Sequence, residues 1–128
     1  MKRIVDKTNI DATLRAYAGA IAQIWLFNIT HKRLAIRFEF KQSDEVLYIV
    51  AVSCEHIAGP FRWSNAQIQI HEQVQENKSV LTIVRDVNVG FELVASSGVA
   101  LLIGPNGEID NSFENFLGDA PEFGAADF

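Results

Sequence analysis

This chain of 128 residues contains one cysteine, three prolines and no long apolar run, and each shortage excludes a class of protein. The single thiol, on Cys54, cannot close an intramolecular disulfide, which argues against a secreted, disulfide-stabilised domain. The start has no charged and then apolar leader with a small-residue cleavage site, so we expect a cytoplasmic protein. The longest apolar stretches, 46–52 and 99–103, are far shorter than the about 20 residues of a membrane helix, so we expect no membrane contact.

The sequence also lacks the spacings that bind metals and cofactors. Its three histidines, His31, His56 and His71, form no zinc-binding spacing with one another or with Cys54. Its glycines form neither a phosphate-binding loop nor a dinucleotide fingerprint, and its serines lie in no nucleophile elbow. We therefore expect no metal and no cofactor, and the sequence favours a non-enzyme over an enzyme.

Basic residues are scarce in the second part of the chain. Residues 1–41 carry eight Lys and Arg against three acids, whereas the rest carries three against thirteen, and the stretch from Glu108 onward has six acids and no base. Affinity for nucleic acid comes largely from a basic face. Lys32, Arg33 and Arg37 offer only a small one, so nucleic acid is not the expected partner. We favour packing of the basic first third beside the acidic last third.

The period of the apolar residues predicts one helix followed by strands. Thr8 or Asn9 can cap a helix, and a stripe with helical spacing follows, so we expect a helix from about Asn9 to Ala22. The stripe consists of Ile10, Leu14, Tyr17, Ala18 and Ile21. The period then changes to two, which predicts strands. These cover residues 25–30, 34–41, 46–53, 64–73, 80–85, 89–95 and 99–103.

Short turns between these segments favour antiparallel pairing of neighbours, because parallel pairs need longer crossovers. The predicted fold class is α+β, with an N-terminal helix packed on a curved antiparallel sheet or half-barrel of about six to seven strands in meander order. We expect a single globular domain over residues 1–110. An acidic, aromatic-containing C-terminal segment, residues 111–128, is expected to be partly docked on it.

The stretch that contains Cys54 and His56 resembles a catalytic pair only superficially. A catalytic cysteine needs a base near its sulfur, but residues two apart on a strand have their Cβ atoms about 6–7 Å apart. We interpret Cys54 as a small apolar residue that ends a buried strand. His56 is interpreted as a loop residue near Gly59 and Pro60 that is available to a ligand.

Phe61, Arg62 and Trp63 form the first candidate for binding. They follow a rigid Gly-Pro turn, and Trp and Arg are the residues most enriched at binding hot spots. The alternative, which we favour, is that Phe61 and Trp63 anchor a strand in the core while Arg62 lies in solvent.

The acidic end of the chain is the second candidate. Its aromatic and aliphatic residues lie among carboxylates, an arrangement that suits docking on a basic partner. The alternative is that the apolar side chains fold back over the protein's own sheet and cover it. We favour this alternative for Phe113, Phe116 and Leu117 and leave the last five residues open. The full set contains the apolar Phe113, Phe116, Leu117, Phe123 and Phe128 and the acids Glu108, Asp110, Glu114, Asp119, Glu122 and Asp127.

These patterns favour a non-catalytic module that binds another macromolecule, such as an adaptor, an inhibitor or an immunity-type protein. Its candidate binding residues are His56, Phe61, Arg62, Trp63, Glu108, Asp110 and Glu114, and its expected partner is a protein with a basic surface. The rival is a small-molecule-binding protein or minor enzyme with a pocket between helix and sheet. That pocket would be lined by Tyr17, Trp25, Phe38, Phe61 and Trp63. A third alternative is a homo-oligomer held together by the charge asymmetry.

Overall fold

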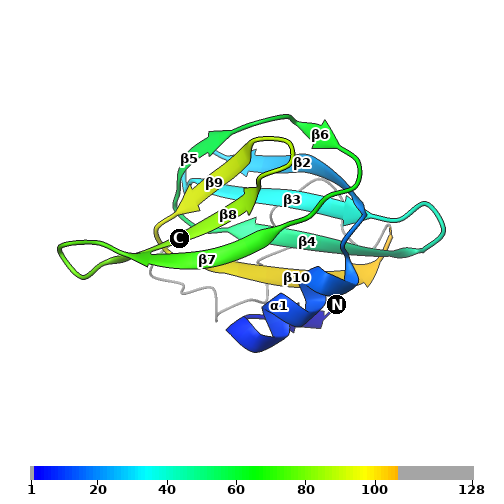
Figure 1. Cartoon of the computed structure of the whole chain (residues 1–128), viewed down its shortest axis with the longest axis horizontal. Coiled ribbons are helices and arrows are strands. Elements are labelled where there is room, and N and C mark those ends of the chain that lie inside the picture. The colour runs from blue at the N-terminus through cyan, green and yellow to red at the C-terminus, as the bar shows by residue number, and fades with distance from the viewer. Residues whose placement is uncertain (1, 107–128) are drawn as a thin grey trace.

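The computed structural model describes residues 2–106 and places them in two antiparallel sheets packed face to face, with one short helix along one side (Figure 1). In order of pairing, the six-stranded sheet contains β1 (Lys2–Ile4), β10 (Val99–Pro105), β4 (Glu45–Ala51), β3 (Arg33–Glu39), β2 (Ile21–Asn28) and β6 (Arg62–Trp63). The four-stranded sheet contains β5 (Cys54–Ala58), β9 (Phe91–Ala95), β8 (Val80–Asp86) and β7 (Gln69–Val74). The α+β class is confirmed, but the prediction of one curved sheet in meander order is wrong.

The helix α1 (Lys7–Ala16) begins earlier than predicted because Asp6, rather than Thr8 or Asn9, is its N-cap. The Asp6 carboxylate accepts a hydrogen bond from the backbone N–H of Asn9 at 3.1 Å, which satisfies one of the donors that the first turn leaves unpaired. The side chain of Asn9, whose Nδ2 donates to Oδ1 of Asp6 at 2.8 Å, and then this backbone bond lower the pKa of the Asp6 carboxyl.

The helix also ends six residues before the predicted Ala22, because the chain turns at Gly19. Gly19 has a φ of +94°, which glycine adopts without a steric penalty. Its N–H then donates to the carbonyl of Ala66 at 2.8 Å, and the N–H of Ala66 donates to the carbonyl of Ala20 at 2.9 Å. This long-range pairing takes the residues after the turn into β2.

The main core lies between the two sheets. The inner faces contribute Phe38, Leu47, Ile49, Leu93 and Leu101, all at most 1% exposed, and α1 adds Ile10 and Leu14 from one side. Strand β4 was predicted to be apolar on both faces, and this is confirmed. Its outward residues Val46, Tyr48 and Val50 belong to a second apolar cluster on the other face of the six-stranded sheet.

Ser53 is the point at which the chain changes sheets. It has a positive φ of 57°, an unusual conformation for a residue with a side chain. Cys54 therefore begins β5 instead of ending the preceding strand, and His56 lies on a strand instead of a loop. The predictions that Cys54 ends a strand and that His56 lies in a loop are therefore wrong. As part of β5, His56 pairs with β9.

Strand β10 completes the six-stranded sheet by pairing with β4 on one side and β1 on the other. Within residues 2–106 no helix has the length and apolar character needed to cross a membrane. The predicted domain boundary at residue 110 and the predicted segment 111–128 lie outside the described residues.

Candidate functional site

A charged pair joins the two central strands on the outer face of the four-stranded sheet. Arg85 of β8 lies opposite Glu92 of β9, and its Nε and Nη2 donate to the same carboxylate oxygen, Oε2, at 3.1 and 2.6 Å. Both side chains are 36% exposed, so the pair contributes only about 0–1 kcal/mol to stability. Its main effect is geometric, because it leaves the second oxygen, Oε1, directed toward β5.

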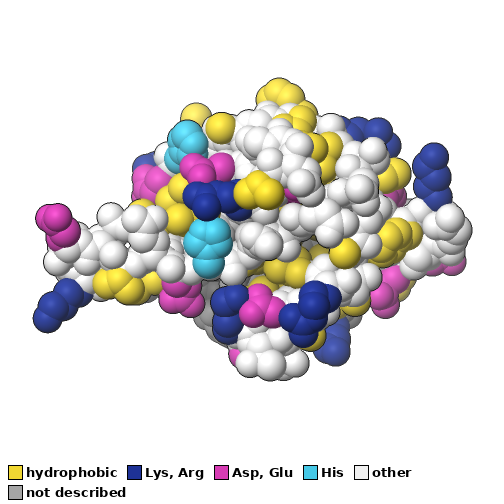
Figure 2. All heavy atoms as spheres, viewed as in Figure 1, with side chains coloured by type: hydrophobic (Ala, Val, Ile, Leu, Met, Phe, Trp, Pro, Cys, Tyr) yellow, Lys and Arg dark blue, Asp and Glu magenta, His cyan; other side chains and the backbone are white. Residues whose placement is uncertain are grey.

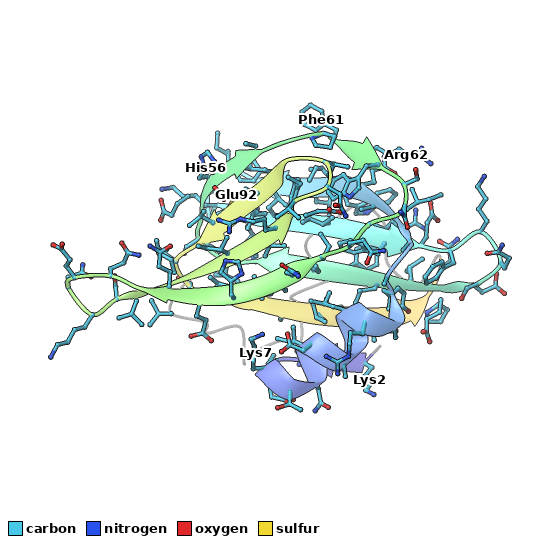
Figure 3. The ribbon with its side chains drawn as sticks, viewed as in Figure 1. Lys2, Lys7, His56, Phe61, Arg62 and Glu92 are labelled. Carbon is cyan, nitrogen blue, oxygen red and sulfur yellow. The ribbon has the colours of Figure 1, made fainter. Side chains whose placement is uncertain are left out.

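Two histidines extend this pair to the outer strands. The Nε2 of His56, on β5, lies 3.8 Å from Oε1 of Glu92. The Nε2 of His71, on β7, lies 3.5 Å from Nη1 of Arg85. The four side chains thus form a polar line across all four strands. Figure 2 shows histidines on this face next to adjoining basic and acidic side chains, and Figure 3 shows His56 and Glu92 close together.

Apolar side chains lie beside the polar line. The register places Val94 opposite both His56 and Ile83, and Ile83 opposite His71. Alternation along each strand puts these residues on the same outer face. We call this surface the histidine face; it consists of His56, His71, Ile83, Arg85, Glu92 and Val94.

Phe61 lies at the edge of this face on a rigid turn. Gly59 has a φ of +124°, and a Cβ there would lie 2.7 Å from Cα of Phe91, so only glycine fits. Two residues later, the carbonyl of Phe61 accepts the N–H of Ile24 at 2.8 Å, which fixes the turn to β2. The Phe61 side chain is nevertheless 80% exposed (Figure 3). We call residues 59–62 the Phe61 corner.

Of the residues predicted at this turn, Trp63 alone is a core residue. It is 7% exposed, its ring centroid lies 4.7 Å from that of Phe91, and its Nε1 donates to Asp86 at 2.9 Å. The prediction that Phe61 and Trp63 both pack in the core is thus confirmed for Trp63 and wrong for Phe61. Arg62 is exposed, as predicted.

Cys54 is buried and its sulfur contacts the backbone of His56 instead of the imidazole. The Sγ atom lies 3.7 Å from the carbonyl oxygen of His56. Burial raises the pKa of the Cys54 thiol, which disfavours the thiolate that nucleophilic catalysis needs. This environment supports a structural role for Cys54.

The structure brings His56, Phe61 and Arg62 to one side of the molecule, while Glu108, Asp110 and Glu114 lie outside the described residues. Sequence reasoning missed Arg85 and Glu92. No local pattern marks them, because their partnership depends on the register of β8 and β9. The one available signal was an acid and a base on consecutive strands joined by a short turn.

Two open grooves flank α1, and neither gathers the aromatic residues predicted to line a pocket. The larger has a volume of about 420 Å³ and lies between the helix and β1. The smaller, of about 380 Å³, lies between the helix and β7. Phe38 and Trp63 are instead in the inter-sheet core, and Trp25 contributes to the cluster on the opposite face of the six-stranded sheet.

The chain matches no protein-family model, no curated protein and no solved structure. Across residues 2–106, moreover, no three His, Cys, Asp or Glu side chains are grouped so that they could hold a metal ion. The features of the described residues that bear on function are therefore the exposed side chains of the histidine face and the Phe61 corner.

Proposed function

We propose that the protein is a non-catalytic binding module and that another protein docks on the Phe61 corner and the adjoining histidine face. The observation that carries this proposal is the 80% exposure of Phe61 on a backbone fixed at both ends. A rigid, exposed aromatic ring loses little conformational entropy when it is covered, and such rings are typical anchors of binding hot spots.

The histidine face supplies the polar surroundings that an aromatic anchor needs. Its charges are already paired, since Arg85 donates twice to Glu92. A partner therefore meets a preorganised surface and does not have to order long side chains one by one. His56 and Arg62, which are both exposed, lie on either side of Phe61 in sequence and provide donors beside its ring (Figure 3).

Affinity capture from the native cell with matched baits tests the proposal. The test bait carries Phe61→Ser and the control bait carries Val74→Ser, because Val74 is 69% exposed on β7, away from the corner. We expect a protein that is retained by the wild type and by Val74→Ser and lost with Phe61→Ser. Equal retention by all three baits contradicts the proposed site, and unchanged melting temperatures verify that neither substitution acts through stability.

The expectation that Glu108, Asp110 and Glu114 recruit a partner with a basic surface is tested separately. Charge reversal of the three together should lower the association rate at low salt, because steering by charge acts mainly on the rate of encounter. The rate should approach that of the wild type as salt is raised. An unchanged rate at low salt would exclude this electrostatic contribution.

The groove between α1 and β1 supports the second candidate, a small-molecule-binding protein. Its volume of about 420 Å³ lies within the range of known ligand sites, and its lining includes Lys2, Tyr17 and Glu45. Native mass spectrometry of the untagged protein, purified gently from its own cells, separates the two candidates. A mass of small-molecule size that is lost on denaturation favours the groove, whereas a second polypeptide favours the Phe61 corner.

A further inference from the structure

The six-stranded sheet is apolar on its outer face as well as on the face that lines the core. Seven residues of this outer cluster are at most 3% exposed, and Trp25 and Leu26 pack against them. The seven are Ala35, Val46, Tyr48, Val50, Val52, Ala100 and Leu102. All of them belong to the six-stranded sheet or to the residue that follows β4.

No described element forms a second layer over this cluster. Within residues 2–106, the inward residues of the four-stranded sheet and of α1 belong to the core on the other side of the six-stranded sheet. A bare apolar face of this size would be an aggregation hazard. Its burial therefore requires a cover from outside the described part of the chain.

Arginines are interspersed with the apolar residues of this face. Arg33 and Arg37 lie on the same side of β3 as Ala35, because residues two apart share a face, and Arg3 of β1 is opposite Leu102 of β10. The guanidinium of Arg37 lies 4.7 Å from the centroid of the Trp25 ring. Arg37 already has an acidic partner in Glu39, whose Oε2 lies 3.4 Å from its Nη2. A cover for this surface thus needs apolar side chains to meet the cluster, and acidic side chains suit a face that carries three arginines better than basic ones do.

We propose that the chain's own C-terminal segment, residues 107–128, docks on the outer face of the six-stranded sheet. Its composition fits both requirements, because it contains six acids, no basic residue and six large apolar side chains. The apolar six are Ile109, Phe113, Phe116, Leu117, Phe123 and Phe128. Acidic and basic groups that face each other also set the orientation of docking.

The point from which the segment departs favours this occupant over a separate molecule. Asn106, the last described residue, accepts a hydrogen bond from Nη2 of Arg37 at 2.6 Å. The segment therefore starts beside the arginine that lies over Trp25. A tethered segment also competes at an effective concentration in the millimolar range, which a partner at cellular concentration does not reach.

Residues 107–128 are long enough to cover the outer face of the six-stranded sheet. An extended chain spans at most about 3.3–3.6 Å per residue, so 22 residues reach about 70 Å. Six strands spaced about 4.8 Å apart span about 24 Å from the first to the last. The segment can cross the face and return, so the proposal needs no strain in the backbone.

A nitroxide spin label on the full-length chain tests the proposal directly. The label is attached at Ser112→Cys in a Cys54→Ala background, so that it occupies one site. We expect loss of the NMR signals of Trp25, Val50 and Leu102, while those of the histidine face persist. The control carries the label at Glu76→Cys, on the turn between β7 and β8, and should leave the signals of the outer face intact.

Two outcomes of this experiment overturn the proposal. One is retention of the signals of Trp25, Val50 and Leu102 with the label at residue 112. The other is an equal loss of these signals in a mixture of spin-labelled, isotope-free chains with isotope-labelled, spin-free chains, because a loss there arises between molecules and would assign the cover to a second copy.

A second variant covers the case in which the Cys54→Ala background disturbs the fold. In the otherwise unchanged full-length chain, Phe113→Ser with Phe116→Ser should shift tryptophan emission to the red and increase binding of a hydrophobic dye, because Trp25 becomes solvated. The matched control Phe61→Ser removes an exposed aromatic ring from the corner and should change neither signal. An unchanged emission in the double variant contradicts the proposal.

Discussion

The indole Nε1 of Trp63 donates a 2.9 Å hydrogen bond to Oδ2 of Asp86, and this carboxylate is completely buried. The same oxygen accepts the backbone N–H of Gln67 at 2.9 Å, and Oδ1 accepts that of Asn88 at 3.2 Å. One carboxylate therefore fixes β6, the segment that leads into β7 and the turn after β8. Buried charges are stable only when they are hydrogen-bonded in this way.

Trp63→Phe should therefore destabilise the protein although it keeps an aromatic ring beside Phe91. The substitution removes one donor from a buried carboxylate, and we expect a loss of about 1–3 kcal/mol in the free energy of unfolding. Asp86→Ala should cost more, because it leaves three donors unpaired. Urea unfolding of the two variants measures both values, and a Trp63→Phe variant as stable as the wild type would show that the hydrogen bond contributes nothing.

Gly59→Ala should be the most damaging glycine substitution among those at positive φ. The added Cβ would lie 2.7 Å from Cα of Phe91, a backbone atom that cannot move aside cheaply. We expect about 1–2 kcal/mol from the backbone conformation and about 1–3 kcal/mol more from overpacking.

Gly98→Ala is the matched control for this substitution. Gly98 also has a positive φ, of +91°, but its added Cβ would meet nothing within 4 Å. Only the conformational cost of about 1–2 kcal/mol should therefore remain. Equal losses for the two variants in urea unfolding would contradict the close contact between Gly59 and β9.

Individual strands were predictable where the residues of one segment indicate a strand without reference to its neighbours. The alternation in residues 34–41 predicted β3 (Arg33–Glu39) to within two residues at each end, and the run at 80–85 predicted β8 (Val80–Asp86) almost completely. In residues 34–41 apolar and polar residues alternate, so the period of two can be read without knowing the neighbouring strands. Residues 80–85 are instead marked by β-branched residues between two polar turns.

The two-sheet arrangement was not predictable because it depends on non-local pairing. Strand β10 pairs with β4 across about fifty residues of sequence, and no short-range pattern encodes that choice. The sequence also did not indicate that the chain changes sheets at Ser53, since serine does not favour a positive φ as glycine does. The polar line from His56 to His71 was not predictable for the same reason, because its four side chains meet only through the pairing register of four strands.

High pH should destabilise the protein through Tyr17. Burial and the hydrogen bond from its hydroxyl to Oε1 of Glu45, at 2.7 Å, raise the pKa of Tyr17 well above its ordinary value. Because the folded-state pKa exceeds the unfolded one, this contribution to stability is complete below the unfolded pKa of about 10. It is lost as the pH rises from there toward the folded-state pKa.

Urea unfolding at a series of pH values from neutral to strongly alkaline measures this dependence. We expect the free energy of unfolding to fall above the unfolded tyrosine pKa, and to fall less steeply in Tyr17→Phe. A residual slope should remain in that variant, because burial also raises the pKa of Tyr48. Identical slopes for the variant and the wild type would exclude Tyr17 as a contributor.

Cys54 should react slowly with thiol reagents in the native protein and rapidly after unfolding. The side chain is 8% exposed, and burial raises the pKa of its thiol, so both access and the thiolate fraction are reduced. The rate of modification by a disulfide reagent at mildly alkaline pH, with and without denaturant, measures the protection. Fast, stoichiometric modification of the folded chain would mean that the thiol is accessible and activated, and it would reopen the catalytic interpretation of Cys54 and His56. Strong protection would leave Cys54 as a core residue at the start of β5, apart from the exposed side chains of Glu55 and His56 that follow it.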